Sequence, residues 1–113
     1  MLEFLSKYFH FLRNKQQIIY QIMIDRFDND SIFPKNNDNG TPPPFRGGNI
    51  EGIINRLDYI IGLGVNSILL SPFFKSNAYH GYHCTTKRNE IEPHFGNEKD
   101  IQSFVKLIKE RRM

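Results

Sequence analysis

The chain has 113 residues, of which 39% are hydrophobic and 24% are charged, so it is long enough for about one small domain with an apolar core. The net charge of +3 is mild, and the basic run at residues 109–112 is typical of a solvated helix end rather than of a nucleic-acid surface. The sequence has no apolar run of membrane-spanning length, no signal-peptide pattern and one cysteine, Cys84, so we expect a cytoplasmic protein without nucleic-acid or membrane partners.

The first predicted element is a helix. Apolar side chains recur at helical spacing over residues 2–13, and we interpret residues 1–17 as an N-terminal helical extension. Residues 18–24 are apolar and β-branched, over a length that suits a buried strand. Residues 28–47 are rich in Asn, Asp, Pro and Gly, which predicts a long irregular segment.

A second helix is predicted after this segment. Asn49 has a side chain that can cap its N-terminus, and Gly62 and Gly64 are expected to end it. Its inward side chains are predicted from their helical spacing to be Ile50, Ile53, Ile54, Leu57 and Ile61.

A second buried strand is predicted at residues 65–70, and residues 72–96 form a second long irregular segment. Asn97 can then cap a last helix. The side chains expected to face inward from this helix are Ile101, Phe104, Val105 and Ile108.

The predicted order is therefore strand, helix, strand, helix. Strands that are joined through helices lie parallel, with right-handed crossovers. Both long segments follow strands, so they lie at the carboxyl ends of the strands, where (β/α)8 barrels build their active sites. The fold class is predicted to be α/β.

The motif Tyr79-His80-Gly81-Tyr82 lies in the second long segment. Tyrosine rings can pack on the apolar face of a sugar while their hydroxyl groups make hydrogen bonds, and His80 adds a donor or an acceptor. Gly81 allows the backbone to bend so that both tyrosines face one cleft. The alternative is an aromatic loop that only packs on its own domain.

Several motifs occur in a consistent order along the chain. They are IYQIMIDRF at residues 19–27, FRGGN at 45–49, LGVNSILLSP at 63–72, YHGY at 79–82 and IEPHFG at 91–96. In this order and spacing they resemble the start of the catalytic domain of α-amylase-type enzymes, glycoside hydrolase family 13, over residues 18–112. The resemblance implies that residues 18–113 are the N-terminal part of such a domain, the first two βα units of a truncated (β/α)8 TIM barrel.

The resemblance also implies roles for two residues of the YHGY motif. The tyrosine that matches Tyr82 stacks on the sugar next to the scissile bond, and the histidine that matches His80 hydrogen-bonds the same sugar. Relatives that trim chain ends commonly have Asp where this chain has His83, which favours an endo-acting parent enzyme. The family usually continues to an Asp-Tyr pair, where this chain has Lys87-Arg88.

A calcium ion beside the first long segment is implied in the same way. Calcium takes hard oxygen ligands, and Ser31 and Asn49 stand where the family often has Asp or better ligands, so fewer charges are offered. The alternative is a solvated loop in which Asn and Asp favour turns for their own reasons. The candidate ligands are Asn29, Ser31, Asn36, Asn37 or Asp38, the Gly47 carbonyl and Asn49.

Two other kinds of site are disfavoured by spacing. The residues His80, His83, Cys84 and His94 match no strong zinc pattern. The segment at residues 46–48 precedes a helix but lacks the full glycine-rich phosphate fingerprint and its lysine.

A retaining glycosidase needs two carboxyl groups about 5 Å apart. In the family these acids, with a further Asp, come from barrel strands four, five and seven, whereas the motifs here belong to the first two strands. Asp28 and Asp58 are not expected to replace them, and Asp25 is expected to pair with Arg26 or with backbone.

The leading prediction is an N-terminal fragment of an α-amylase-type hydrolase that acts on an α-glucan or maltooligosaccharide in its intact parent and is inactive alone. The alternative is a non-catalytic carbohydrate-binding or interaction module that needs a second, downstream polypeptide to complete the barrel. A small nucleotide-binding βαβ protein is disfavoured because the glycine fingerprint is absent.

Overall fold

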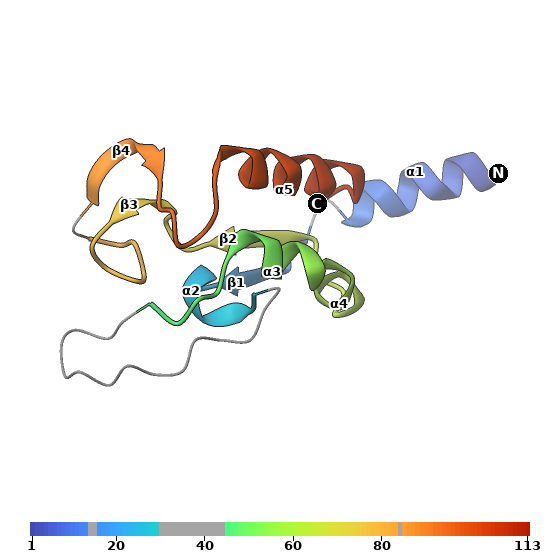
Figure 1. The fold of residues 1–113 in the computed structure, drawn as a ribbon. Coiled ribbons are helices and arrows are strands. Elements are labelled where there is room, and N and C mark those ends of the chain that lie inside the picture. Colours follow the sequence, from blue (N-terminus) through green and yellow to red (C-terminus); the bar gives the residue numbers. More distant parts are fainter. Residues whose placement is uncertain (14–15, 30–44, 84) are drawn as a thin grey trace.

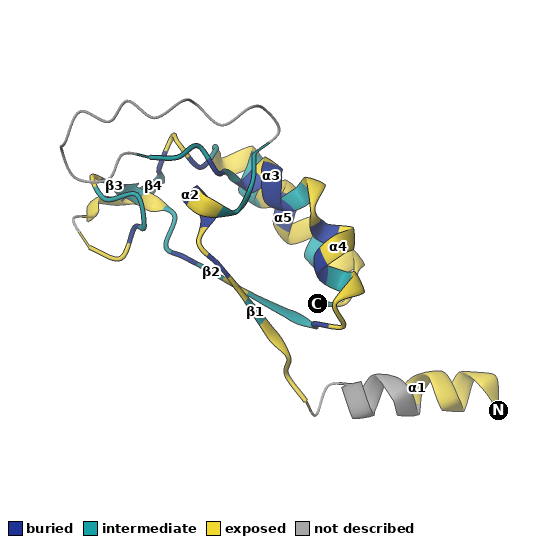
Figure 2. Ribbon diagram, turned by 90° about the horizontal axis from the view of Figure 1, so that it is seen from below, coloured by how far each residue is buried: buried dark blue, intermediate teal, exposed yellow. Residues whose placement is uncertain are grey.

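The computed structural model describes residues 1–13, 16–29, 45–83 and 85–113, and of residues 8–13 the backbone alone. The predicted N-terminal helix is confirmed as α1 (Leu2–Arg13). Figures 1 and 2 show α1 extending away from the other elements. Its first side chains are correspondingly exposed, with 86% of Leu2 and 70% of Phe4 open to solvent. In the described part of the chain, no helix is both long and apolar enough to cross a membrane.

The two predicted strands are present and lie parallel. Strand β1 (Ile19–Ile22) pairs with β2 (Ser67–Leu70), and the register places Ile19 beside Ser67 and Ile22 beside Leu70. The first strand ends earlier than predicted because the Ile24 amide donates to Ser71 Oγ (2.9 Å) and a short helix, α2 (Ile24–Phe27), begins there. The Ser71 amide in turn donates to the Ile22 carbonyl (2.8 Å), so the carboxyl ends of the two strands are joined directly.

The helix predicted after Asn49 is two helices. They are α3 (Ile50–Asn55) and α4 (Leu57–Gly62), separated by a turn at Arg56 with φ −103° and ψ 7°. The Asn49 cap is confirmed, since its side chain accepts the Gly52 amide hydrogen at 2.8 Å. The turn rotates the buried face of α4 relative to that of α3. Ile60 is therefore fully buried, whereas Ile61, which was predicted to face inward, is only partly buried.

The last helix is α5 (Glu98–Glu110), capped by Asn97 as predicted. Asn97 accepts from the helix backbone, and the Asp100 carboxylate accepts the Asn97 amide hydrogen at 2.8 Å, which completes a capping box. The prediction for Val105 was wrong, because its side chain is 42% exposed. The stripe that packs inward is narrower and consists of Ile101, Phe104 and Ile108.

The second long segment is not wholly irregular, which corrects the prediction. Strand β3 (Phe74–Ser76) pairs antiparallel with β4 (Thr85–Ile91), with Phe74 opposite Ile91 and Ser76 opposite Thr85. Strand β4 is polar and mostly exposed on both faces, so it carries no apolar alternation that a sequence pattern would reveal.

The core lies between the parallel strands and the helices. Figure 2 shows buried residues on the side of α3 and α4 that faces the strands, whereas β1 and β2 are mostly intermediate or exposed, with Ile22 buried at the end of β1. The opposite face of the strand pair stays open, with Ile19 54% and Leu69 52% exposed. The core cluster consists of Ile22, Ile24, Ile50, Ile53, Ile60, Val65, Phe95 and Phe104.

Candidate functional site

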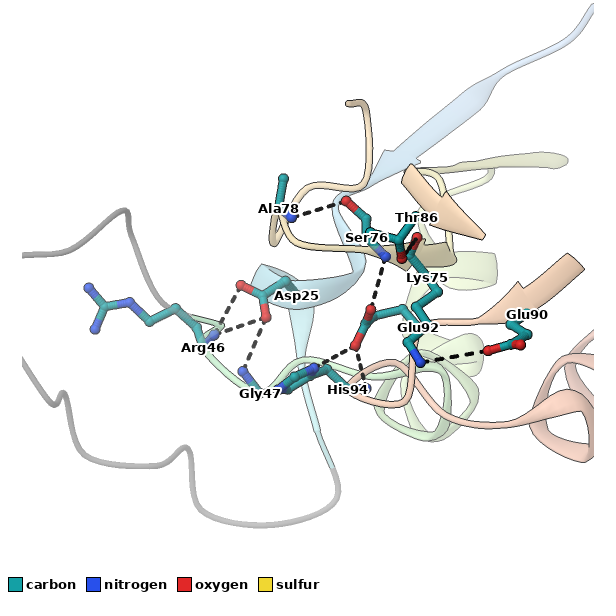
Figure 3. A network of polar contacts seen from close by, with 10 residues as sticks. All are labelled: Asp25, Arg46, Gly47, Lys75, Ser76, Ala78, Thr86, Glu90, Glu92 and His94. Atoms are coloured by element: carbon teal, nitrogen blue, oxygen red, sulfur yellow. Dashed lines mark hydrogen bonds and ion pairs between the residues drawn. The ribbon is translucent and has the colours of Figure 1, made fainter. Parts of the chain in front are cut away.

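Asp25 organises the segment that leads into α3. Its side chain is fully buried at the carboxyl end of β1. The Arg46 amide donates to both of its carboxylate oxygens (2.9 and 3.0 Å), and the Gly47 amide donates to Oδ1 (3.3 Å), as Figure 3 shows. The Arg26 side chain donates from Nε to Oδ2 at 2.8 Å. Asp25 therefore pairs with both Arg26 and backbone, as predicted from the sequence.

Gly48 allows the two segments to come this close. Its amide donates to the Asp25 carbonyl at 2.9 Å. A Cβ atom at Gly48 would lie 2.1 Å from the Ile24 carbonyl oxygen, which is far inside a normal contact distance. The glycine is thus required by close backbone approach.

Arg26 also contacts the second long segment. Its guanidinium carbon lies 4.0 Å from the centroid of the Tyr79 ring. This is a cation–π arrangement, in which the ring's negative face attracts the guanidinium. Through Asp25 and Arg26, the segment at residues 45–48 is therefore linked to the loop that carries the YHGY motif.

The YHGY motif forms a tight turn. Gly81 has φ +72°, its amide donates to the Ala78 carbonyl (3.0 Å), and a Cβ there would lie 2.2 Å from the Pro72 carbonyl oxygen. The turn brings His80 and Tyr82 together, with ring centroids 5.8 Å apart and planes 32° from parallel. Tyr82 as a whole is 56% exposed, so part of its surface is accessible to a ligand.

The orientation of His80 follows from one hydrogen bond. Its Nδ1 accepts the amide hydrogen of Tyr82 at 3.0 Å. In a neutral imidazole one nitrogen accepts and the other carries the hydrogen, so Nε2–H is the donor that remains for a ligand. An exposed phenol ring beside a fixed N–H donor can bind one face and one hydroxyl group of a sugar.

Ser76 holds the loop between β3 and β4. Its hydroxyl donates to the His83 carbonyl (2.8 Å) and accepts the Ala78 amide hydrogen (3.0 Å). Its own amide donates to Glu92 Oε2 at 3.0 Å. Both ends of the loop are thus held at one buried serine.

Glu92 is a buried carboxylate that the sequence did not single out. Besides Ser76, it accepts from the backbone amide of His94 (3.4 Å), and His94 Nδ1 lies 2.6 Å from Oε1. Burial raises the pKa of Glu92, but the hydrogen bonds from His94 and Ser76 outweigh burial, so its pKa lies below the ordinary value. The only sequence signal was its position in the IEPHFG motif.

The described candidate calcium ligands lie close together. The Asn29 side chain donates from Nδ2 to the Gly47 carbonyl at 3.0 Å, and the Asn49 amide donates to the Asp28 carbonyl at 3.0 Å. Asn49 Oδ1 caps α3 but has a second lone pair. These neutral oxygens suit calcium, although Asp28 itself is paired with Arg56. The candidates Ser31, Asn36, Asn37 and Asp38 lie outside the described residues.

Among the other residues discussed from the sequence, those with described positions form no second site. Asp58 makes a surface ion pair with Arg111 (2.7 Å) and is 81% exposed. The rings of His80 and His83 are 4.4 Å apart, while Cys84 lies outside the described residues. Among the residues with described positions, no three His, Cys, Asp or Glu side chains gather closely enough to hold a metal ion.

Comparison with known proteins gives a match to one protein family. Residues 20–113 match the family model described as alpha amylase, catalytic domain. The chain is 42% identical over 95 residues to alpha-amylase 2 of Dictyoglomus thermophilum, covering 84% of this chain and 16% of that protein. It is 38% identical over 104 residues to a cyclomaltodextrinase of Geobacillus thermopakistaniensis, covering 86% and 18%.

Solved structures give the same result. The α-amylase of Geobacillus thermoleovorans in complex with acarbose matches with a TM-score of 0.73 and 35% identity, over 86% of this chain and 21% of that one. A cyclic α-maltosyl-(1→6)-maltose hydrolase of Arthrobacter globiformis in complex with maltose matches with a TM-score of 0.75 and 28% identity, over 91% and 24%. The chain therefore spans less than a quarter of the length of these relatives.

Proposed function

Because this chain belongs to the α-amylase catalytic-domain family, we infer that it forms the first two βα units of a (β/α)8 barrel whose intact enzyme cleaves or transfers α-glucosidic bonds. The observation that carries this proposal is the juxtaposition of His80 and Tyr82 beyond the carboxyl end of β2. Relatives named as α-amylases and cyclomaltodextrinases support an α-glucan or maltooligosaccharide as the substrate.

In this proposal the two residues bind one sugar unit. The exposed ring of Tyr82 packs on the sugar next to the bond that is cleaved, and His80 donates from Nε2 to a hydroxyl group of the same sugar. Both contacts position the sugar for attack by groups that lie elsewhere in the barrel.

The described acids near this site already have structural partners. Asp25 is held by Arg26 and by backbone amides, Asp28 by Arg56, and Glu92 by Ser76 and His94. A retaining mechanism needs a nucleophile and an acid/base about 5 Å apart, which the family takes from later strands. We therefore propose that this chain alone does not hydrolyse α-glucans.

Calcium is proposed at the base of the first long segment. Asn29, the Gly47 carbonyl and Asn49 would hold it, together with candidates outside the described residues. The ion would stabilise the segment rather than take part in the reaction. Calcium should raise the midpoint of thermal unfolding while magnesium should not, and Asn49→Asp should increase the shift by adding a charged ligand that still caps α3. Equal midpoints with and without calcium in both variants would remove this part of the proposal.

A second candidate function is favoured by the open face of the strands. Ile19 and Leu69 are more than half exposed there, and parallel strands are normally covered on both faces. This chain would then be a non-catalytic carbohydrate-binding or interaction module, and a downstream polypeptide that completes the barrel would cover this face. For either function we propose a cytoplasmic location, as the name intracellular maltogenic amylase indicates for a relative from Bacillus subtilis.

The test compares the chain alone with the chain joined to the remaining barrel of the Geobacillus thermoleovorans α-amylase. We expect no release of reducing sugar from starch, maltooligosaccharides or pullulan by the chain alone, and measurable release by the joined protein. Turnover by the chain alone that disappears on changing one of its own acids would refute the proposal. A joined protein that folds and binds maltotriose without any turnover would favour the binding module.

A further inference from the structure

We propose that Ser76 and Glu92 are positioning residues for glucan binding, because together they hold both ends of the loop that presents His80 and Tyr82. This inference rests on the proposed function of that loop. Neither residue contacts the sugar in this proposal, and both act through the loop backbone.

The first step of the argument is the closure of the loop at Ser76. Its hydroxyl joins the start of the loop, at the Ala78 amide, to its end, at the His83 carbonyl. His80 and Tyr82 lie between these two points. A single side chain therefore sets the spacing of the loop ends, and the turn around Gly81 is built within that spacing.

The second step is the anchoring of Ser76 by Glu92. Glu92 Oε2 accepts the Ser76 amide hydrogen (3.0 Å), and the Glu92 amide donates to the Phe73 carbonyl (2.8 Å), so Glu92 is held both to Ser76 at the end of β3 and to the residue before β3. Only 4% of each residue is exposed. A buried acceptor with its donors in place is hard to rearrange, because an unpaired buried polar group is costly.

The third step is the connection of Glu92 to the rest of the site. Its other oxygen is paired with His94, and the His94 ring stacks on Phe45, which comes from the segment before α3 (Figure 3 shows the Glu92 contacts). Glu92 thus fixes the YHGY loop relative to the segment that Asp25 organises. The YHGY loop and the described segment at residues 45–48 are therefore held together.

The experiment uses the full chain with Ser76→Ala, Glu92→Ala and Glu92→Gln. Ser76 and Glu92 each have a matched control residue on the same hairpin. Thr86→Val removes a hydroxyl that donates to the Lys75 carbonyl at 3.2 Å, and Glu90→Gln removes an exposed carboxylate paired with Lys75 and Lys87. Figure 3 shows both control contacts beside the Ser76–Glu92 pair.

The first measurement is amide hydrogen exchange, with the 15N chemical shift of His80 Nδ1 as a spectroscopic signature. We expect exchange of the Ala78 and Tyr82 amides to rise about tenfold in Ser76→Ala and Glu92→Ala. The Nδ1 signal should move toward that of an imidazole without the Tyr82 hydrogen bond. Glu92→Gln keeps an acceptor for the Ser76 amide and should restore most of the protection. The control variants should leave both readouts unchanged.

The second measurement is titration with maltotriose, followed through the signals of His80 and Tyr82. In the parent chain these signals should shift, and the midpoint should rise at least threefold in Ser76→Ala. Unchanged exchange in the loop, or a loss of protection spread equally over α3, would overturn the positioning role. If exchange and the Nδ1 signal respond as expected but maltotriose shifts nothing in the parent chain, the proposed function fails, and the glucan part of this inference fails with it.

Discussion

The imidazole ring of His94 lies flat against the ring of Phe45, with 3.8 Å between the centroids and 3° between the planes. The two residues come from segments far apart in the sequence, since Phe45 precedes α3 and His94 follows β4. Phe45 also contacts the buried ring of Phe95, with centroids 5.9 Å apart. The stacked pair therefore joins the first loop to the hydrogen-bond network of Glu92.

Replacing Phe45 should loosen this junction. Phe45→Ala removes the stacking with His94 and part of the packing on Phe95, and Phe45 is only half-buried, so we expect a loss of about 1–3 kcal/mol in the free energy of unfolding. Denaturant titration measures it. Tyr59→Ala, at a ring that is 58% exposed, should change stability much less. Equal losses of unfolding free energy in both variants would show that the stacking of Phe45 on His94 does not contribute measurably to stability.

Asp58 serves as the control for a substitution at Asp25. Asp25→Asn turns one acceptor oxygen into an amide donor that faces Arg46 N–H or Arg26 Nε–H, so we expect a loss of about 2–4 kcal/mol in the free energy of unfolding. Asp58→Asn breaks only a surface ion pair with Arg111 and should change little. If Asp25→Asn leaves the free energy of unfolding unchanged, the segment before α3 is held by packing alone.

Substitution of Gly81 tests the turn of the YHGY motif, and substitution of Gly62 is the control. Gly81→Ala combines a left-handed φ with a clash on the Pro72 carbonyl, so we expect a loss of about 2 kcal/mol or more, or a displaced loop. Gly62→Ala meets no atom within 4 Å at the end of α4 and should be neutral or slightly stabilising. Thermal unfolding and the Tyr82 ring signals give the comparison. Similar behaviour of the two alanine variants would contradict the tight turn.

The acid sensitivity of the chain should depend on Glu92. Its pKa is lower folded than its ordinary value of 4.5, so its stabilising contribution is present above pH 4.5 and is lost as the pH falls through the folded value. The group that faces it is His94. Free energies of unfolding measured by denaturant from pH 7 downward should fall more steeply in the parent than in Glu92→Gln.

Salt separates this effect from surface charges. The pKa of Glu90 is also lowered, mainly by its hydrogen bond with Lys87, but Glu90 lies at the surface. Added salt should therefore weaken the acid dependence that is due to Glu90 and leave that of Glu92 largely in place. Curves for the parent and for Glu92→Gln that run parallel down to acidic pH would contradict the assignment.

Tyr82 is the residue whose change should affect turnover most directly. In the chain joined to the remaining barrel of a relative, Tyr82→Ala should raise the activation barrier by about 1–3 kcal/mol, by analogy with aromatic stacking on flat ligands. Tyr82→Phe keeps the ring face and should retain more activity. The kcat and KM of both variants on maltooligosaccharides decide this. If Tyr82→Ala is fully active while His80→Ala is inactive, the loop binds the sugar through hydrogen bonding alone.

The parallel strand pair, the starts of α3 and α5 and the family could be predicted from the sequence. The apolar runs that became β1 and β2, and the caps at Asn49 and Asn97, are local patterns, because a strand or a cap depends on residues only a few positions apart. The resemblance that rested on the order and spacing of five motifs, YHGY and IEPHFG among them, was confirmed by the family match over residues 20–113. The roles of His80 and Tyr82 in binding, and the calcium ligands, remain predictions.

Tertiary structure decided the features that depend on distant partners. The helix predicted after Asn49 is interrupted at Arg56. The Arg56 side chain donates a hydrogen bond to Asp28, which lies at the start of the first long segment, and no local sequence pattern predicts this contact. The polar β4 became a strand only by pairing with β3. From the sequence alone Glu92 would be expected at the surface, as most glutamates are. In the folded chain it is buried, and Ser76 and His94 supply the hydrogen-bond donors for its carboxylate. A buried carboxylate is tolerated only where such donors converge, and the folded chain alone brings them together.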